Sequence, residues 1–407
     1  MTALNFLNFI QYLFLIYSGF YAVYLLFYAI ASFFYKYGGK TSTNRLRKFL
    51  ILIPAYKEDK IIINTATEAL KQDYPSDLYD VYVIADSFKR ETIELLQNED
   101  NIQCIEVSFK LSTKARSINK ALQAITEEYD GVIILDADNI MDDDLILKVN
   151  NAMANGSKAI QCHRVAKNQD TSFAILDALS EEINNTIFRK GHIALGISSA
   201  LIGSGMAFEY KLYRSIMKTI DTYADEDKEL EIKLFLNRIK IDFLNDVYVY
   251  DEKVTNSKVF VKQRSRWISS QIFYARTYIF KSIYELFKHS NFDFFDKMLQ
   301  LLLAPRILML GITFIIAVLS SFFNRGFLFY SWLVVFLAFV LALVISVPKR
   351  FYNKQTLLAL LSLPYGFLMM ALALFKIKLG HNRLSPTPHH TANHTKNERI
   401  RERIKNL

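Results

Sequence analysis

Long charge-free segments near both ends of the chain set the first limit on how it can fold. Residues 2–35 contain no charged side chain, and three further apolar runs cover residues 307–323, 327–347 and 355–375. Since a membrane-spanning helix needs about 20 apolar residues, all but the run at 307–323 are long enough to cross a bilayer. The mixed sequence between these ends is long enough for one domain of about 150–250 residues.

The first apolar segment, residues 1–35, is predicted to be a retained transmembrane anchor. It lacks the basic start and the small-residue cleavage site of a signal peptide. The positive-inside rule places the domain that follows in the cytoplasm, at the inner or plasma membrane. The basic residues on which this orientation depends are Lys36, Lys40, Arg45, Arg47 and Lys48.

The C-terminal transmembrane region, residues 301–378, does not fit a single topology under the same rule. Three spans after a cytoplasmic domain would place the basic residues beyond the last run on the outer side. Either Pro364 and Gly366 make that run re-entrant, or Arg306 marks a segment that never crosses. The polar tail, residues 379–407, is expected to be mobile and to hold no metal at its histidines.

The net charge of +9 does not point to a nucleic-acid partner, because the basic residues cluster beside the apolar segments. Membrane lipids with anionic head groups, together with a substrate diphosphate, explain them better. The two cysteines, Cys104 and Cys162, are expected to be reduced thiols in the core of a cytoplasmic domain.

Strand-like and helix-like segments alternate in the middle of the chain, which predicts an α/β fold with a parallel sheet and helices on both faces. Ligands of such sheets bind beyond the carboxyl ends of the strands, where Glu58, Asp86 and Asp136 are expected. Residues 271–300 mix aromatic and basic side chains, which favours helices in the membrane interface over a surface helix of the soluble domain. Strands are predicted at 49–55, 81–85, 102–107, 132–135, 159–165 and 247–251, and helices at 61–71, 114–125, 172–190 and 226–239.

Carboxylates at three positions are the candidates for chemistry. Asp136 and Asp138 follow an apolar strand, and a pair of this kind can share Mg²⁺ or Mn²⁺ with substrate phosphates. Asp86, at the end of another strand, can accept a hydrogen bond from a nucleobase. The acidic run Asp225–Asp227 opens a helix, where it either favours the helix dipole or supplies a general base, for which Asp227 is the choice. The run Asp142–Asp144 is interpreted as the cap of a helix.

A basic and aromatic segment precedes the C-terminal membrane region. Within Gln263–Trp267, Arg266 can make paired hydrogen bonds to a phosphate, and Trp267 offers a flat face to a sugar ring. An anchor at the lipid boundary would use the same residue types. Together with the acidic strand ends, the segment indicates an enzyme that uses a nucleotide-activated substrate beside a bilayer.

These segments, in this order, resemble the membrane-anchored family 2 glycosyltransferases, which include the cellulose, chitin and hyaluronan synthases. The resemblance covers about residues 48–270. It implies a cytoplasmic GT-A catalytic domain, a nucleotide-sugar donor that is usually a UDP-sugar, and inverting transfer. Five blocks carry it: Ile53–Glu58, Val83–Asp86, Asp136–Asp138, Glu226–Asp227 and Gln263–Trp267.

The resemblance also implies roles for individual residues. Asp138 is the foremost metal ligand, with Asp136, and the catalytic pair is Asp227, as the base, and Glu226. Donor binding is implied for Ala55, Tyr56, Glu58, Asp86, Lys114, Asn119, Asp136 and Arg266. Binding of the acceptor or the diphosphate is implied for Gln263, Trp267, Gly203, Ser204 and Gly205.

The chain departs from the family pattern at Lys57, where asparagine is usual, and at Asp225, where threonine is usual. Its C-terminal membrane region is small for a synthase that forms its own polymer channel. Three functions therefore stay open: synthesis of a polysaccharide or cell-surface glycan, in which export proteins are possible partners; addition of one sugar to a polyprenyl-phosphate carrier or other lipid-linked acceptor; and a transporter or channel subunit with a nucleotide-sensing domain.

Overall fold

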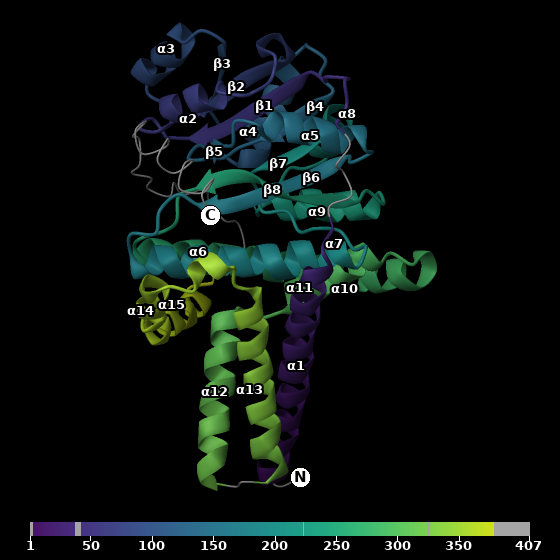
Figure 1. The fold of residues 1–407 in the computed structure, drawn as a ribbon, viewed down its shortest axis with the longest axis vertical. Helices are drawn as coiled ribbons and strands as arrows, with labels where there is room; N and C mark the ends of the chain where they lie inside the picture. Colours follow the sequence, from purple (N-terminus) through teal and green to yellow (C-terminus); the bar gives the residue numbers. More distant parts are fainter. Residues whose placement is uncertain (1–2, 37–41, 223, 324–325, 378–407) are drawn as a thin grey trace.

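The protein is described from a computed structural model that covers residues 3–36, 42–222, 224–323 and 326–377. The predicted tail 379–407 lies outside these residues. The chain forms three tiers, in which a sheet domain stands on a layer of helices that lie across it, and three apolar helices run away from that layer (Figure 1). The tiers follow from the sequence, since only the outer segments are apolar on all sides.

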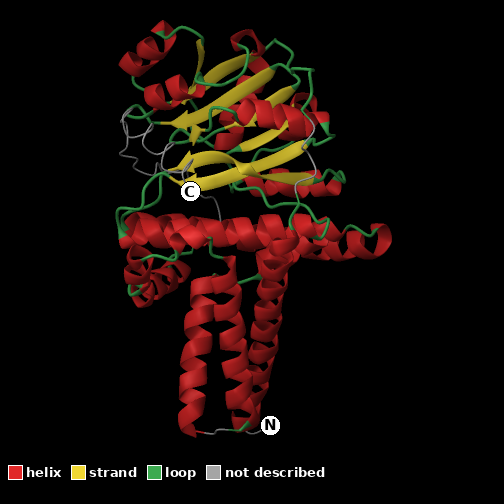
Figure 2. Cartoon of the chain, viewed as in Figure 1, coloured by secondary structure: helices red, strands yellow, loops and turns green. Residues whose placement is uncertain are grey.

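One sheet of eight strands forms the upper tier, which Figure 2 shows in yellow. Its strands lie in the order β3-β2-β1-β4-β7-β6-β8-β5. Strands β1 to β4 are parallel, β7 is antiparallel to both of its neighbours, and β6 is parallel to β8. The predicted α/β fold is therefore confirmed, with a mixed rather than purely parallel sheet. The strands are β1 (Phe49–Tyr56), β2 (Tyr79–Asp86), β3 (Ile102–Val107), β4 (Gly131–Ile134), β5 (Ile140–Met141), β6 (Ala159–Ala166), β7 (Met206–Glu209) and β8 (Ile241–Asp251).

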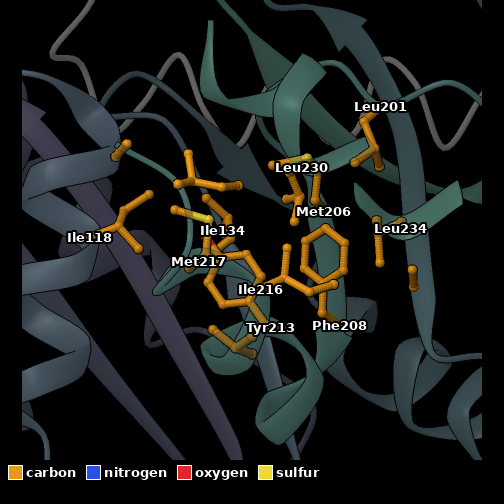
Figure 3. Packing of buried hydrophobic residues seen from close by; sticks show 14 of the residues in the cluster. Ile118, Ile134, Leu201, Met206, Phe208, Tyr213, Ile216, Met217, Leu230 and Leu234 are labelled. Carbon is orange, nitrogen blue, oxygen red and sulfur yellow. The ribbon is translucent and has the colours of Figure 1, made fainter. Parts of the chain in front are cut away.

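Alternate side chains of the central strands enter two separate cores, one on each face of the sheet. Leu50 and Leu52 of β1 are buried in one core, and Ile51 and Ile53 in the other. The first core also takes in Phe208 and residues of α4, α8 and α9 (Figure 3). The helices around the sheet are α2 (Ile62–Ala69), α3 (Arg90–Asn98), α4 (Lys114–Ala124), α5 (Leu145–Ala154), α8 (Tyr210–Met217) and α9 (Glu226–Leu236).

The middle tier consists of helices that lie across the ends of the apolar helices (Figure 1). α6 (Ser172–Asn184) continues through a π-helical segment, η3 (Asn185–Gly191), into α7 (His192–Ala194). α10 (Ser257–His289) is one helix that runs through residue 270, where the sequence predicted a domain boundary. α11 (Phe292–Leu302) packs against it.

Three long apolar helices form the lower tier: α1 (Ala3–Ala31), α12 (Arg306–Phe323) and α13 (Phe327–Ser346). Two helices, at Phe9–Phe34 and Phe327–Ser346, are long and apolar enough to cross a membrane alone. The last apolar run is broken into α14 (Lys354–Leu360) and α15 (Leu363–Phe375), which bend by 50° beside the bundle. Pro364 stands in the first turn of α15, as expected where a helix restarts. A bent pair of this kind is compatible with a broken membrane span as well as with a re-entrant loop.

A buried polar cluster joins α1 to the middle tier. Tyr24 and Tyr28 both donate hydrogen bonds to Oδ1 of Asp296 on α11, at 2.8 and 3.0 Å. His192 of α7 contacts the other carboxylate oxygen at 2.9 Å, and its ring stacks on Tyr28 with centroids 3.8 Å apart. Gly191 allows this approach, because an added Cβ would lie 2.2 Å from the carbonyl oxygen of Tyr28. Buried polar groups need such partners, so α1 is tied to the domain by more than apolar contact.

Candidate active site

A cleft of about 490 Å³ opens beyond the carboxyl ends of β1 and β4, on the side facing the middle tier. Four segments that are distant in sequence contribute to its wall: the end of β1, the turn after β4, the start of α9 and the early turns of α10. Parallel strands bring their carboxyl ends to one edge, which explains why the first two segments meet there. Predicted site residues that line the cleft are Ala55, Tyr56, Glu58, Lys114, Asp136, Asp138, Gly203, Glu226, Asp227, Gln263, Arg266 and Trp267.

Lys114 connects two of these segments, the turn after β4 and the start of α9, with the turn at Gly203. Its Nζ lies 2.6 Å from Oδ1 of Asp136 and 3.3 Å from Oε1 of Glu226, and it donates to the carbonyl oxygen of Gly203 at 2.7 Å. Burial by itself lowers the pKa of Lys114, but the two carboxylates outweigh it and hold the pKa above the ordinary value. The ammonium group therefore remains charged, as a counter-ion within the acidic wall.

Asp138 is more buried than Asp136 and is fixed by its neighbours. Its Oδ2 accepts a hydrogen bond from the backbone N–H of Glu252 at 2.9 Å, and its Oδ1 accepts one from Asn139 at 3.3 Å. Nowhere in the described ranges do three or more His, Cys, Asp or Glu side chains converge as a metal cage. Two carboxylates on one wall of an open cleft nevertheless fit Mg²⁺ or Mn²⁺, which complete their coordination with substrate phosphates and water.

The start of α9 presents three acidic residues with different partners. Asp225 pairs with Lys228 at 2.9 Å and lies 3.6 Å from Nε of Arg266. Burial raises the pKa of Glu226 above its usual value, with Lys114 opposing the change. Asp227 lies against Gly203, where an added Cβ would stand 3.4 Å from Oδ2. The φ of Gly203 is +85°, so glycine both permits the turn and keeps space beside this carboxylate.

The basic and aromatic segment lies on α10, which begins at the N-cap Asn256. Trp267 is covered on one face by the guanidinium of Arg264, 4.3 Å from the ring centroid, and Arg264 pairs with Asp177 of α6. Oε1 of Gln263 is buried and has no hydrogen-bond partner in the structure. Helical spacing sets Gln263, Arg266 and Trp267 on neighbouring positions of one face, as i, i+3 and i+4.

Four of the predicted site residues do not line the cleft. Asp86 is buried at the end of β2, where its carboxylate accepts hydrogen bonds from three serine hydroxyls, and only one of these serines, Ser117, reaches the cleft. Asn119 donates to the carbonyl oxygen of Ile220, which fixes the loop before α9. Ser204 and Gly205, which follow Gly203 in the chain, are not part of the cleft lining. Whether a predicted site residue lines the cleft depends on the direction of its side chain, and the order of the motifs does not give that direction.

Acidic and basic residues at the floor of the cleft were not among the predicted site residues. Glu181 of α6 lies 3.1 Å from Arg164, 3.2 Å from Arg189 and 3.7 Å from Lys253. Although burial raises the pKa of Glu181, these cations outweigh it and lower that pKa to about 2. The sequence signal for this group was the presence of charged residues within the helix predicted at 172–190. Their partners lie in other segments, so this signal could not identify them.

The sheet order and the acidic ends of its parallel strands are those of a GT-A domain. One matching solved structure is a mannosyltransferase from Pyrobaculum calidifontis, PcManGT, in complex with GDP-Man and Mn²⁺. It is 15% identical, with a TM-score of 0.51 over 84% of this chain and 99% of that one. At this identity the likeness shows the fold alone. Residues 47–270 match the family described as glycosyltransferase like family 2, and the chain belongs to that family.

Curated relatives act on lipid and glycan acceptors, according to their names. A beta-monoglucosyldiacylglycerol synthase from Trichormus variabilis is 24% identical over 223 residues, covering 53% of this chain and 47% of that protein. The poly(ribitol-phosphate) beta-N-acetylglucosaminyltransferase TarS from Staphylococcus aureus is 22% identical over 238 residues, covering 56% of this chain and 39% of that protein. The chain therefore spans about half or less of the length of these relatives.

Proposed function

We propose that the protein is a membrane-bound, inverting glycosyltransferase that moves a sugar from a nucleotide-sugar donor to a glycan or lipid-linked acceptor at the cytoplasmic face. One observation carries this proposal. The carboxylates after β4, the acidic start of α9 and the Gln263–Trp267 segment all line one cleft, although they are far apart in the chain.

In this mechanism Tyr56 and Glu58 border the nucleotide, and Arg266 neutralises charge on the departing diphosphate. Asp227 accepts the proton of the acceptor hydroxyl as its oxygen attacks the anomeric carbon. Lys114 holds Asp136, Glu226 and the turn at Gly203 in place. Asp136 and Asp138 would hold Mg²⁺ or Mn²⁺, which when bound stabilises negative charge on the leaving group.

Purified full-length protein in detergent tests the proposal, with a panel of UDP- and GDP-sugars and release of the nucleotide as the readout. We expect one donor to be turned over, a chelator to stop the reaction, and Asp138→Ala to lower the rate about 100-fold or more. Asp144→Asn is the matched control, since this carboxylate is partly exposed and lies outside the cleft. No turnover of any donor, or a wild-type rate with chelator present, would contradict the proposal.

A further inference from the structure

A second, larger cavity of about 990 Å³ lies below the cleft, between α6, α10 and the apolar helices α12 to α15. It is lined mostly by aliphatic and aromatic side chains, and its volume is at the upper end of the range of about 300–1,000 Å³ that holds small ligands. The two cavities share part of their wall, at Asp177, Ser180, Asn184, Arg264, Trp267 and Gln271. An amphiphilic molecule can therefore occupy both at once.

The charges of this lower cavity indicate the chemistry of its occupant. Its lining includes three basic side chains, those of Arg264, Arg306 and Lys354, and one acidic side chain, that of Asp177. Arg264 and Asp177 neutralise each other. The net charge of the remaining lining residues is therefore positive, and the rest of the cavity wall is mainly hydrocarbon.

Arg306, at the start of α12, is the residue that points most directly to an anion. Its Nη2 donates to the backbone oxygen and the hydroxyl of Ser180, both at 3.1 Å. Its Nη1 is buried without a hydrogen-bond partner. Glu181 attracts Arg306 only at longer range, and no ion pair found among the described residues includes Arg306. A buried charge of this kind is unfavourable unless an anion accompanies it, and a guanidinium pairs well with phosphate.

We infer, on the basis of the proposed function, that the acceptor is an anionic lipid with a phosphate between its hydrocarbon chain and a hydroxylated head group. The chain fills the lower cavity, the phosphate binds Arg306, and the head group passes Arg264 and Trp267 into the cleft. There a head-group hydroxyl oxygen forms the new bond to the anomeric carbon, and its proton passes to Asp227. The bond from that carbon to the diphosphate breaks, and the nucleoside diphosphate leaves.

Direct binding tests this inference without any donor. The chain contains two tryptophans, so Trp332→Phe leaves Trp267 as the only tryptophan, beside the shared wall. Farnesyl phosphate, farnesol and inorganic phosphate are titrated into full-length protein in detergent. We expect farnesyl phosphate to quench the fluorescence with at least about tenfold higher affinity than farnesol. Inorganic phosphate should bind far more weakly than either.

Arg306→Gln should lower the affinity for farnesyl phosphate about tenfold and leave that for farnesol unchanged. Arg276→Gln, at an exposed arginine of α10, is the matched control and should change neither. Equal affinity of wild type for farnesyl phosphate and farnesol would overturn the inference, and this comparison needs no variant at Arg306 to fold.

The product identifies the acceptor among possible lipids. Native membranes that contain the protein are incubated with the radiolabelled donor, and the lipid extract is separated by anion exchange. We expect an acidic labelled lipid that wild-type protein forms and Arg306→Gln forms poorly. A neutral labelled lipid, or label only in water-soluble glycan, would overturn the inference while leaving the transferase proposal intact. Absence of nucleotide release with every donor would instead count against the transferase proposal.

Discussion

At the scale of single residues, the proposed base Asp227 gives the sharpest test of mechanism. Asp227→Asn keeps the shape of the side chain but cannot accept the proton, so transfer should slow by about 10²- to 10⁴-fold. Donor affinity, measured by calorimetry with the intact nucleotide-sugar, should stay within a few-fold of wild type. Asp221→Asn, at an exposed carboxylate before α9, should be nearly silent. A wild-type rate for Asp227→Asn would mean that another group is the base.

The depressed pKa of Glu181 predicts a pH dependence of stability. The carboxylate titrates near 4.5 when unfolded and near 2 when folded, so its contribution is complete above about pH 4.5 and is lost as the pH falls toward 2. Within this window the free energy of unfolding should fall by up to about 1.4 kcal/mol per pH unit from this group. Thermal unfolding of wild type and Glu181→Gln in detergent, compared across the window, measures the difference. If the stability of wild type and of Glu181→Gln changes with pH in the same way, Glu181 does not cause the pH dependence.

Lys57 shows what a residue pattern conveys and what it does not. It departs from the asparagine that the family resemblance leads one to expect, and the structure gives it a φ of +58°, a conformation that asparagine adopts more easily than lysine. The sequence could reveal the departure but not the backbone angle. Likewise, the resemblance implied donor binding for both Lys114 and Asn119, but only Lys114 lines the cleft, since positions five residues apart on one helix face different sides.

At the scale of elements, α10 places Trp267 where the cleft and the lower cavity meet. Trp267→Ala should therefore impair use of the acceptor, with a rise in its KM of about tenfold or more, and change donor affinity little. Initial rates at varied donor and acceptor concentrations separate the two effects. Trp332→Phe, within the apolar bundle, is the control. An equal loss for both substrates would indicate that Trp267 only supports the fold of α10.

The contact between η3 and α1 predicts a stability effect far from the cleft. Gly191→Ala forces a methyl group against the backbone of Tyr28, so the protein should lose about 1–3 kcal/mol of stability. Gly19→Ala is the matched control in α1, because its added Cβ meets Val335 at an ordinary 3.8 Å. Thermal unfolding in detergent measures both. If the two variants are equally stable, the helices do not pack as closely as described.

Periodicity was sufficient for most elements of the sheet domain. The strand expected at 102–107 matches β3, and the helix expected at 114–125 begins at Lys114, after Thr113, whose side chain accepts the capping hydrogen bond. The interpretation of Asp142–Asp144 as a helix cap holds in position, since Asp144 is the N-cap residue of α5, but the side chain of Asp144 makes no capping hydrogen bond. Asp142 accepts a hydrogen bond from Tyr250 instead. That contact joins residues 108 positions apart, which local pattern cannot reveal.

At the scale of the whole molecule, composition foretold apolar ends around an α/β domain but not how they meet. Glu181 and Glu182 of α6 are buried against cations from several tiers, and the local pattern of this helix does not identify those partners. The lower cavity depends on the bend between α14 and α15, which uniform hydrophobicity does not specify. Tertiary packing, rather than any local signal, therefore decides where an acceptor can enter.

The hydrogen bond from Tyr24 to Asp296 spans 272 residues, which has a consequence for biosynthesis. The ribosome adds about 5–20 residues per second, so α1 waits on the order of tens of seconds before its partner is made. Throughout that interval the phenol groups of Tyr24 and Tyr28, near the end of α1, lack the carboxylate that accepts their hydrogen bonds. The polar contacts of α1 are thus completed only after Asp296, in the last third of the polypeptide, has been made. A nascent chain released before α11 would leave α1 without this polar partner.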